Sequence, residues 1–266
     1  MVKAEDDRRQ SGEPVSADEL EARLRQIGAE RYHNLHPFHQ RLHAGACSLD
    51  EVRAWALNRY CYQRTIPLKD AAMLARLDDI VLRREWRQRL VDHDGEIDDA
   101  PEGGLRRWLA LTDQLGLERD YVVSLNGVLP AVRFACDAYV RFVERMPLLD
   151  AIASSLTELF SPSIIRERVT GMLAHYPFVT ADTLRYFEHR LTEAPRDVSF
   201  ALEFVKRHAT TAAQQEAACA ALRFKCDMLW AQLDAIEHAY VAGNVPPGAW
   251  HPDDAAGHAP VDGRGG

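Results

Sequence analysis

Long apolar runs are missing from this 266-residue sequence, which has nothing approaching the roughly 18 to 20 residues that a membrane span requires. An excess of positive charge is missing too, because 32 Lys and Arg residues are outnumbered by 40 Asp and Glu residues. The first residues, MVKAEDDRRQSGEP, are polar and acidic, unlike a secretory signal or an arginine-rich transit peptide. We therefore expect a cytoplasmic protein without a membrane or nucleic-acid partner.

Cysteine is sparse, and its five positions are an odd number without a CxxC pair. This pattern is typical of buried thiols in a reducing compartment and speaks against a disulfide framework or a zinc site. The glycine-rich GxGxxG and P-loop motifs and the GxSxG nucleophile motif are also absent. Common nucleotide-binding and serine-hydrolase folds are therefore not indicated.

What the sequence has in abundance is helix-forming residues, with apolar positions recurring every three or four residues and almost no period-2 alternation. We predict one all-α domain, a compact bundle of about seven helices, over residues 17–242. Residues 1–16 are predicted to be a disordered tail, and the Gly- and Pro-rich residues 243–266 a linker or tail that can be removed without loss of folding. Ser48 and Glu51 form a plausible capping box, and Pro67 and Pro130 mark kinks or first helical positions.

Four histidines crowd the segment RYHNLHPFHQRLH, at positions 33, 36, 39 and 43. Imidazole is a common metal ligand, and Glu30 with His33 forms the E-x-x-H pair of di-iron bundles. No second E-x-x-H follows, however, and Pro37 interrupts the helical spacing. Solvated or capping histidines therefore explain most of the cluster better than a metal site does.

Several cations occur in helical, partly apolar settings. Arg59 is spaced four residues from Gln63, and Arg190 is spaced four residues from Tyr186, so each pair shares a helix face. Lys225 lies in the apolar run LRFKCDMLW. Buried cations need an anion, supplied either by a neighbouring helix or by a ligand. Together they favour a closed pocket for a small polyanion.

Two further groups complete the candidates. His93 stands between carboxylates in DHDG, where it is either a helix-end histidine or a catalytic base. Glu158 is an acid in the largely apolar segment SSLTELF.

A series of long motifs, in this order, resembles the pyrroloquinoline-quinone synthase (PqqC) family: RYHNLHPFH, NRYCYQRTIPLKDAA, LVDHDG, LPAVRFACDAYV, SSLTELFSP, HYPFV and LRFKCDMLWAQLDA. The resemblance covers about residues 25–240. It implies a haem-oxygenase-like bundle that forms a homodimer and catalyses the final step of pyrroloquinoline quinone (PQQ) biosynthesis. That step closes a ring and oxidises a ring-open quinoline polycarboxylate with O2, releasing H2O2 without a metal or organic cofactor.

The resemblance also assigns roles to residues of this sequence. It implies catalytic roles for His33, His93, Tyr186 and Arg190. It implies substrate binding by Tyr32, Arg59, Gln63, Tyr139, Glu158, Arg168 and Lys225. Ile165 departs from the pattern, since a histidine of the oxygen site is expected there. The tail resembles a linker that in some relatives leads to a small peptide-chaperone domain (PqqD).

Two other functions stay open from the sequence. One is a haem-oxygenase-like di-iron oxidase that uses Glu30 and His33. The other is a non-catalytic carrier of PQQ or its precursor.

Overall fold

The computed structural model describes residues 12–98 and 102–253, with the side chains of 192–198 excepted. Helices are the only regular secondary structure in this part of the chain. Its α-helices are α2 (Ala17–Arg31), α3 (Pro37–His43), α4 (Leu49–Leu74), α5 (Ile80–Asp94), α6 (Gly104–Gln114), α7 (Arg119–Ser124), α8 (Pro130–Arg145), α9 (Leu148–Ala153), α10 (Ser161–His175), α11 (Arg185–His208) and α12 (Ala212–Ile236). Four short 3₁₀ or π segments are η1 (His33–Leu35), η2 (Ser154–Leu159), η3 (Asp182–Leu184) and η4 (Glu237–Val241).

The all-α prediction is confirmed, but the expected number of about seven helices is wrong for the described residues, which hold eleven α-helices, α2 to α12. Three of them, α3, α7 and α9, have only six or seven residues. Pieces of fewer than two turns show no amphipathic repeat, so a periodicity argument does not detect them.

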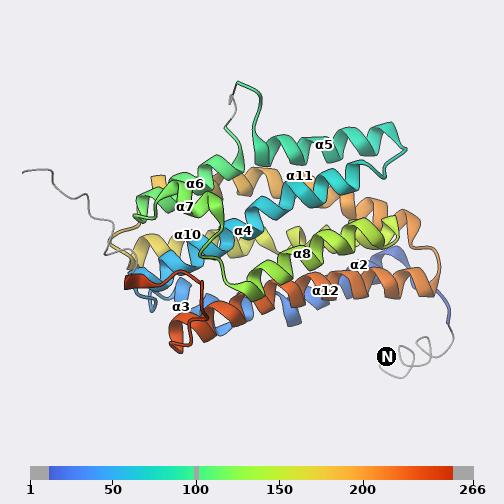
Figure 1. The fold of residues 1–266 in the computed structure, drawn as a ribbon. Coiled ribbons are helices and arrows are strands. Elements are labelled where there is room, and N and C mark those ends of the chain that lie inside the picture. Colours follow the sequence, from blue (N-terminus) through green and yellow to red (C-terminus); the bar gives the residue numbers. More distant parts are fainter. Residues whose placement is uncertain (1–11, 99–101, 254–266) are drawn as a thin grey trace, which may run out of the picture.

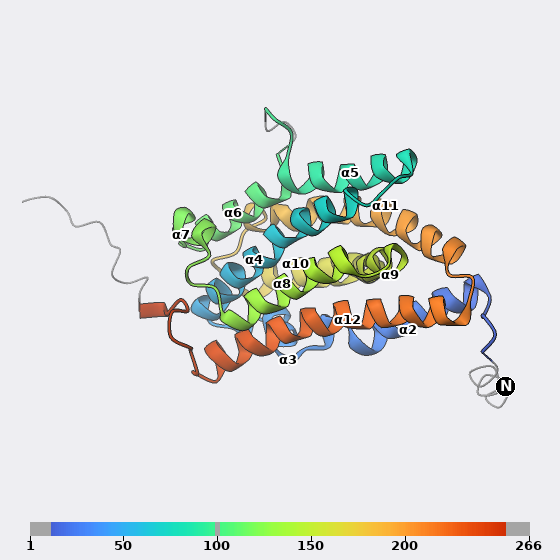
Figure 2. The same ribbon diagram turned by 45° about the vertical axis from the view of Figure 1, so that its right-hand side comes forward.

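The long helix α4 runs through the centre of the bundle and contacts α8, α5 and α6. Helix α12 contacts α8, α2, α9 and η2, while α11 crosses η2, α9 and α10 (Figures 1 and 2). Buried aromatic side chains such as Trp55, Trp86 and Trp108 fill the space around α4. Segments distant in sequence, α2, α4, α10 and α11, are thereby brought to one interior region.

Local signals in the sequence predict helix starts correctly. Ser48 Oγ accepts from the Glu51 backbone N–H at 3.1 Å, and the Glu51 carboxylate accepts from the Ser48 N–H at 2.6 Å, which completes the capping box. Pro130 occupies the first turn of α8, and Pro67 lies inside α4.

No single helix among the described residues is long and apolar enough to cross a membrane, whereas the bent pair Leu148–Leu159 and Ser161–His175 meets that test jointly.

Contacts with the bundle are made beyond both predicted limits of the body. Val15 is buried, and its backbone exchanges two hydrogen bonds with the Gln215 side chain. Trp250 is also buried, its N–H donates to the Gly127 carbonyl at 2.9 Å, and its carbonyl accepts from Tyr240. Trp250 therefore packs against the bundle, and the expectation that residues 243–266 can be removed without loss of folding stays a prediction. The division into tail, body and linker stays a prediction, and residues 1–11 and 254–266 lie outside the described residues.

Replacing Trp250 by Ala is expected to lower the free energy of unfolding by about 3 kcal/mol, because a buried indole is lost and a cavity is left. Urea unfolding measures this loss. His251→Ala, a change at the exposed neighbouring residue, serves as the control and should shift the midpoint little. Equal midpoints for the parent and Trp250→Ala would show that the Trp250 contact adds no stability.

Candidate functional site

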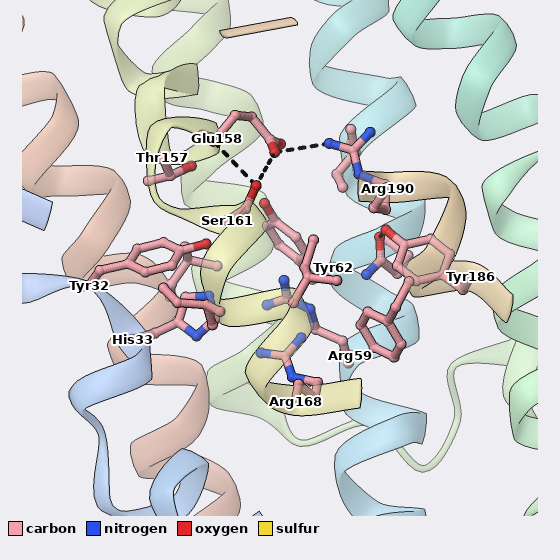
Figure 3. Close-up of a pocket in the computed structure, with 16 residues that line it drawn as sticks. Tyr32, His33, Arg59, Tyr62, Thr157, Glu158, Ser161, Arg168, Tyr186 and Arg190 are labelled. Carbon is pink, nitrogen blue, oxygen red and sulfur yellow. Dashed lines mark hydrogen bonds and ion pairs between the residues drawn. The ribbon is translucent and has the colours of Figure 1, made fainter. Parts of the chain in front are cut away.

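An interior cavity lies where α4, α10, α11, η2 and the end of α2 meet (Figure 3). Eight residues singled out in the sequence line the cavity: Tyr32, His33, Arg59, Gln63, Glu158, Arg168, Tyr186 and Arg190. Ile165 also lines it, so an apolar side chain forms the wall where the resemblance implies a histidine.

Helical spacing explains two pairs of cavity residues. Arg59 and Gln63 point inward from one face of α4, and Tyr186 and Arg190 do so from one face of α11. The two pairs meet across the cavity, since the Tyr186 hydroxyl donates to Gln63 Oε1 at 2.7 Å. The Tyr186 ring also stands edge-on to Trp108, at 4.9 Å between centroids. The Tyr186 side chain is thus held at the wall of the cavity both by its hydroxyl group and by its ring.

Positive charge dominates the cavity wall. Arg190 forms an ion pair with the Glu158 carboxylate at 2.9 Å, and Ser161 donates to the same carboxylate (Figure 3). Burial would raise the pKa of Glu158, but Arg190, Arg89 and the Ser161 hydrogen bond outweigh it and lower that pKa to about 2. Glu158 is therefore ionised and is the one carboxylate among the lining residues.

Arg59 and Arg168 are the two other guanidiniums of the cavity. The described side chains place no carboxylate within ion-pair distance of either. Burial, and then the nearby charge of Arg59, lower the pKa of Arg168 to about 10, so it keeps its proton near neutral pH. Two cations without a counter-ion among the described side chains leave the cavity ready for a ligand that carries several negative charges.

Lys225 and Tyr139 lie behind the cavity and do not line it. The Lys225 amino group donates to the Tyr62 hydroxyl at 2.9 Å and lies 3.4 Å from the centre of the Tyr139 ring. Tyr62 itself lines the cavity. Burial, together with Lys69 and Arg59, lowers the pKa of Lys225 well below its usual value. A ligand carboxylate near Tyr62 would reverse that shift.

His93 lies in the last turn of α5, which confirms the helix-end position, and it is not among the lining residues. Its Nδ1 is 3.0 Å from the Arg89 carbonyl oxygen, so Nδ1 carries the proton and donates. Its Nε2 is buried and has no hydrogen-bond partner among the described residues. Burial and the Arg190 charge lower the pKa of His93 to about 4, so the Nε2 lone pair is available to accept a proton.

A buried ion cluster supports the α5 side of the site. Asp70, which is completely buried, contacts Lys69 at 2.5 Å and Arg89 at 3.4 Å, and it accepts from the Trp86 indole at 2.8 Å. Burial raises the pKa of Asp70, but the two cations outweigh it and hold that pKa below its usual value. Since Arg89 also holds His93, the cluster fixes the position of that imidazole.

The histidine segment is buried, so the expectation of solvated histidines is wrong for positions 33, 36, 39 and 43. The capping interpretation is confirmed for His36, whose Nδ1 accepts from the Phe38 N–H at the start of α3. Arg168 donates to Nε2 of both His39 and His43, at 3.2 and 3.3 Å, which occupies the lone pairs a metal would need. Within the described residues no three His, Cys, Asp or Glu side chains are arranged to hold a metal.

Glu30, the other member of the E-x-x-H pair, is exposed and accepts from Gln26 at 2.7 Å. His33 is buried and faces the cavity. The geometry therefore does not support a di-iron centre on these two residues.

Sequence reasoning missed part of the wall. The lining residues that were not singled out as candidates are Tyr62, Ile66, Thr157, Ser161, Ile164, Phe187 and Leu229. Most of these are apolar or hydroxyl side chains, which in a sequence look like ordinary core positions. Tyr62 is the one with a detectable signal, because it neighbours Gln63 on the same helix.

Comparison with known proteins gives consistent results. Residues 21–235 match the TENA/THI-4/PQQC family. The chain is 63% identical over 240 residues to a pyrroloquinoline-quinone synthase of Acidiphilium cryptum, covering 90% of this chain and 97% of that protein. It is 64% identical over 241 residues to a bifunctional coenzyme PQQ synthesis protein C/D of Methylorubrum extorquens, covering 90% of this chain and 64% of that protein.

Solved structures show the same fold at low identity. A domain of Shewanella denitrificans with a heme oxygenase-like fold superposes with a TM-score of 0.69 at 11% identity, covering 89% of this chain and 99% of that one. A TenA homologue of Pseudomonas syringae gives 0.66 at 13% identity, covering 86% of this chain and 95% of that one.

Buried histidines should make stability depend on pH. His43 and His93 have a pKa of about 4 in the folded protein, and burial is the main cause in both. The unfolded chain therefore binds more protons between pH 6.5 and 4, and the free energy of unfolding falls as the pH falls through that range. Each histidine should cost about 3 kcal/mol at pH 4.

Urea unfolding at a series of pH values checks this. His43→Asn should make the slope between pH 6.5 and 4 less steep by the contribution of one histidine, whereas the exposed His238→Asn should keep the parental slope. A parental slope in His43→Asn would contradict the assignment.

Proposed function

Because the chain belongs to the TENA/THI-4/PQQC family, we propose that it acts as a pyrroloquinoline-quinone synthase in the final step of PQQ biosynthesis. It closes the last ring of a ring-open quinoline polycarboxylate and oxidises the product with O2, releasing H2O2. The names of its relatives at about 60% identity, which match 90% of the chain, support this proposal.

The observation that carries the proposal is the excess of positive charge around a buried cavity. Three guanidiniums, from Arg59, Arg168 and Arg190, face one carboxylate there. A polycarboxylate supplies the missing negative charge, and guanidinium groups bind carboxylates through two parallel hydrogen bonds. Arg59 and Arg168 hold the substrate, while Lys225 acts through Tyr62 or moves to meet a carboxylate.

In ring closure the substrate amine bonds to an electrophilic ring carbon that is conjugated to a carbonyl, and the displaced electron pair passes to the carbonyl oxygen. Protons must then be removed from the nitrogen and from carbon. His93 is the proposed base, because its Nε2 lone pair has no partner and its Nδ1–H is fixed on a carbonyl. Its pKa of about 4 makes it a weak base. An anionic substrate screens Arg190 and raises that pKa toward the range useful for catalysis.

Oxidation moves two electrons and two protons from the cyclised, electron-rich intermediate to O2, which forms H2O2 and a product with one more double bond. Arg190 and Tyr186 lie on one face of α11, so a fixed cation and a phenol meet where negative charge develops on oxygen. We propose that this chemistry needs no metal or organic cofactor, because the substrate itself is the reductant.

Three finer features belong to the same proposal. The protein forms a homodimer, for which the exposed Ile80 and Val81 at the start of α5 offer an apolar contact. A peptide-chaperone domain (PqqD) reaches it through the C-terminal segment, as the bifunctional C/D relative suggests. The protein works in the cytoplasm.

Incubation of the chelator-treated protein with the ring-open precursor, first without oxygen and then with it, tests the function. We expect an anaerobic complex, followed by oxygen uptake, H2O2 and PQQ. A bound spectrum without oxygen uptake would identify a carrier. Activity that returns only with added iron would identify a metal-dependent oxidase, and both results would overturn the proposal.

His93→Asn should bind the precursor with near-parental affinity but produce PQQ at least 100-fold more slowly, because the amide keeps a donor and loses the base. Anaerobic titration and single-turnover absorbance measure the two effects separately. PQQ formation at the parental rate would show that His93 is not the base.

Lys225 should take up a proton when the precursor binds. Burial lowers its pKa well below the usual value, and a nearby carboxylate favours the ammonium form. Anaerobic calorimetry at a series of pH values up to the usual lysine range, in buffers of different ionisation enthalpy, counts the protons taken up on binding. Lys225→Met should abolish the uptake, whereas Lys206→Met, a change on the surface, should not. Unchanged uptake in Lys225→Met would assign the proton to another group.

A further inference from the structure

Three histidines and Arg168 form one hydrogen-bonded chain that leads away from the cavity. His33, which lines the cavity, has its Nδ1 2.8 Å from the Nδ1 of His39. The Nε2 of His39 is 3.2 Å from Arg168 Nη2, and the Nε2 of His43 is 3.3 Å from Arg168 Nε. The Nδ1 of His43 lies 3.5 Å from the Glu167 carboxylate, which is largely exposed.

The donors in this hydrogen-bonded series can be assigned by starting from the Arg168 guanidinium. A guanidinium only donates, so the Nε2 atoms of His39 and His43 both accept from Arg168. A neutral His39 then carries its proton on Nδ1 and donates it to the Nδ1 of His33. A neutral His33, in turn, must carry its proton on Nε2.

Burial and the surrounding cations keep these imidazoles neutral. The pKa values of His33 and His39 are well below their usual range, mainly because both rings are buried. Arg59 from α4, Arg168 from α10 and Lys225 from α12 act on His33 in the same direction. Protonation of both rings would also place two N–H groups against each other across the 2.8 Å contact.

Close packing of α10 on α3 holds the hydrogen-bonded histidines and Arg168 in place. Gly171 follows Arg168 by three residues on α10, and a Cβ at Gly171 would lie 2.3 Å from the His43 carbonyl oxygen. A larger residue would therefore push the two helices apart. The Arg168 guanidinium is also confined by the rings of Phe187 and Trp55, at 5.2 and 5.8 Å.

We infer that His39 is a positioning residue, which Arg168 orients and which in turn fixes His33 as an Nε2–H donor for an acceptor oxygen of the bound ligand. His33 then works as a hydrogen-bond donor and cannot act as a base or metal ligand through Nε2. Arg168 has two functions, since it supplies charge to the cavity and sets the tautomer of His33 through His39. This inference rests on the proposed function only in taking an oxygen-rich anion as the ligand.

Nitrogen NMR of the ¹⁵N-histidine-labelled full-length protein, without ligand, reads the tautomer directly. The signals of His33, assigned by comparison with His33→Gln, should show a protonated Nε2 and a bare Nδ1. His39→Leu should give a mixture of tautomers at His33. His39→Asn, whose amide can still donate to Nδ1, should restore the Nε2–H form.

His43→Leu is the matched control, because it also removes one acceptor of Arg168 but leaves His39 in place. It should keep the parental tautomer of His33. Anaerobic titration with the ring-open precursor should show about tenfold weaker binding in His39→Leu and less than threefold weaker binding in His43→Leu and His39→Asn. A tenfold loss corresponds to about 1.4 kcal/mol, which is within the net range of one typical hydrogen bond.

A parental His33 protonated on Nδ1, or an unchanged tautomer in His39→Leu, would overturn the inference. Should His39→Leu fail to fold, the parental spectrum and the His39→Asn titration still decide it. A protein that shows the expected tautomers but makes no PQQ would leave the inference standing and remove only the proposed function.

Discussion

Three guanidinium groups, from Arg59, Arg168 and Arg190, meet at one cavity inside a protein whose net charge is −8. Charges in a dry interior are costly unless they are paired, and here Glu158 pairs with Arg190 alone among the three. The cavity therefore has an excess of positive charge that an anionic ligand would neutralise. Local positive charge, held close together by α4, α10 and α11, overrides the global acidity for a small ligand.

The same cations determine the state of the other titratable groups. Arg190, with Arg89 and the Ser161 hydrogen bond, lowers the pKa of Glu158 to about 2, and Arg190 also helps to keep His93 neutral. Arg59 and Arg168 act in the same way on His33, and Arg59 opposes the charge on Lys225. A neutral imidazole has one donor and one acceptor, so its hydrogen bonds fix which atom faces the ligand. For this reason the contacts of His93 with the Arg89 carbonyl and of His33 with His39 bear directly on chemistry.

Supporting contacts hold these groups in place. The buried Asp70 binds Lys69, Arg89 and Trp86, and thereby anchors the helix that carries His93. The lack of a side chain at Gly171 matters as much, since a Cβ there would lie 2.3 Å from the His43 carbonyl oxygen. Such close approaches cannot tolerate a small shift between helices, so the bundle must be tightly packed for the cavity to keep its geometry.

Helical periodicity and cap residues determined the all-α class, the Ser48 cap and the inward faces of α4 and α11, because these depend on neighbours three or four residues apart. The distinctive motifs, together with that spacing, marked eight of the lining residues. Only the tertiary structure decided that Lys225 stands behind Tyr62, that Trp250 returns to the bundle, and that Arg168 reaches His39 and His43. These contacts join residues up to 163 positions apart in the chain, where no local pattern records which side chains will meet.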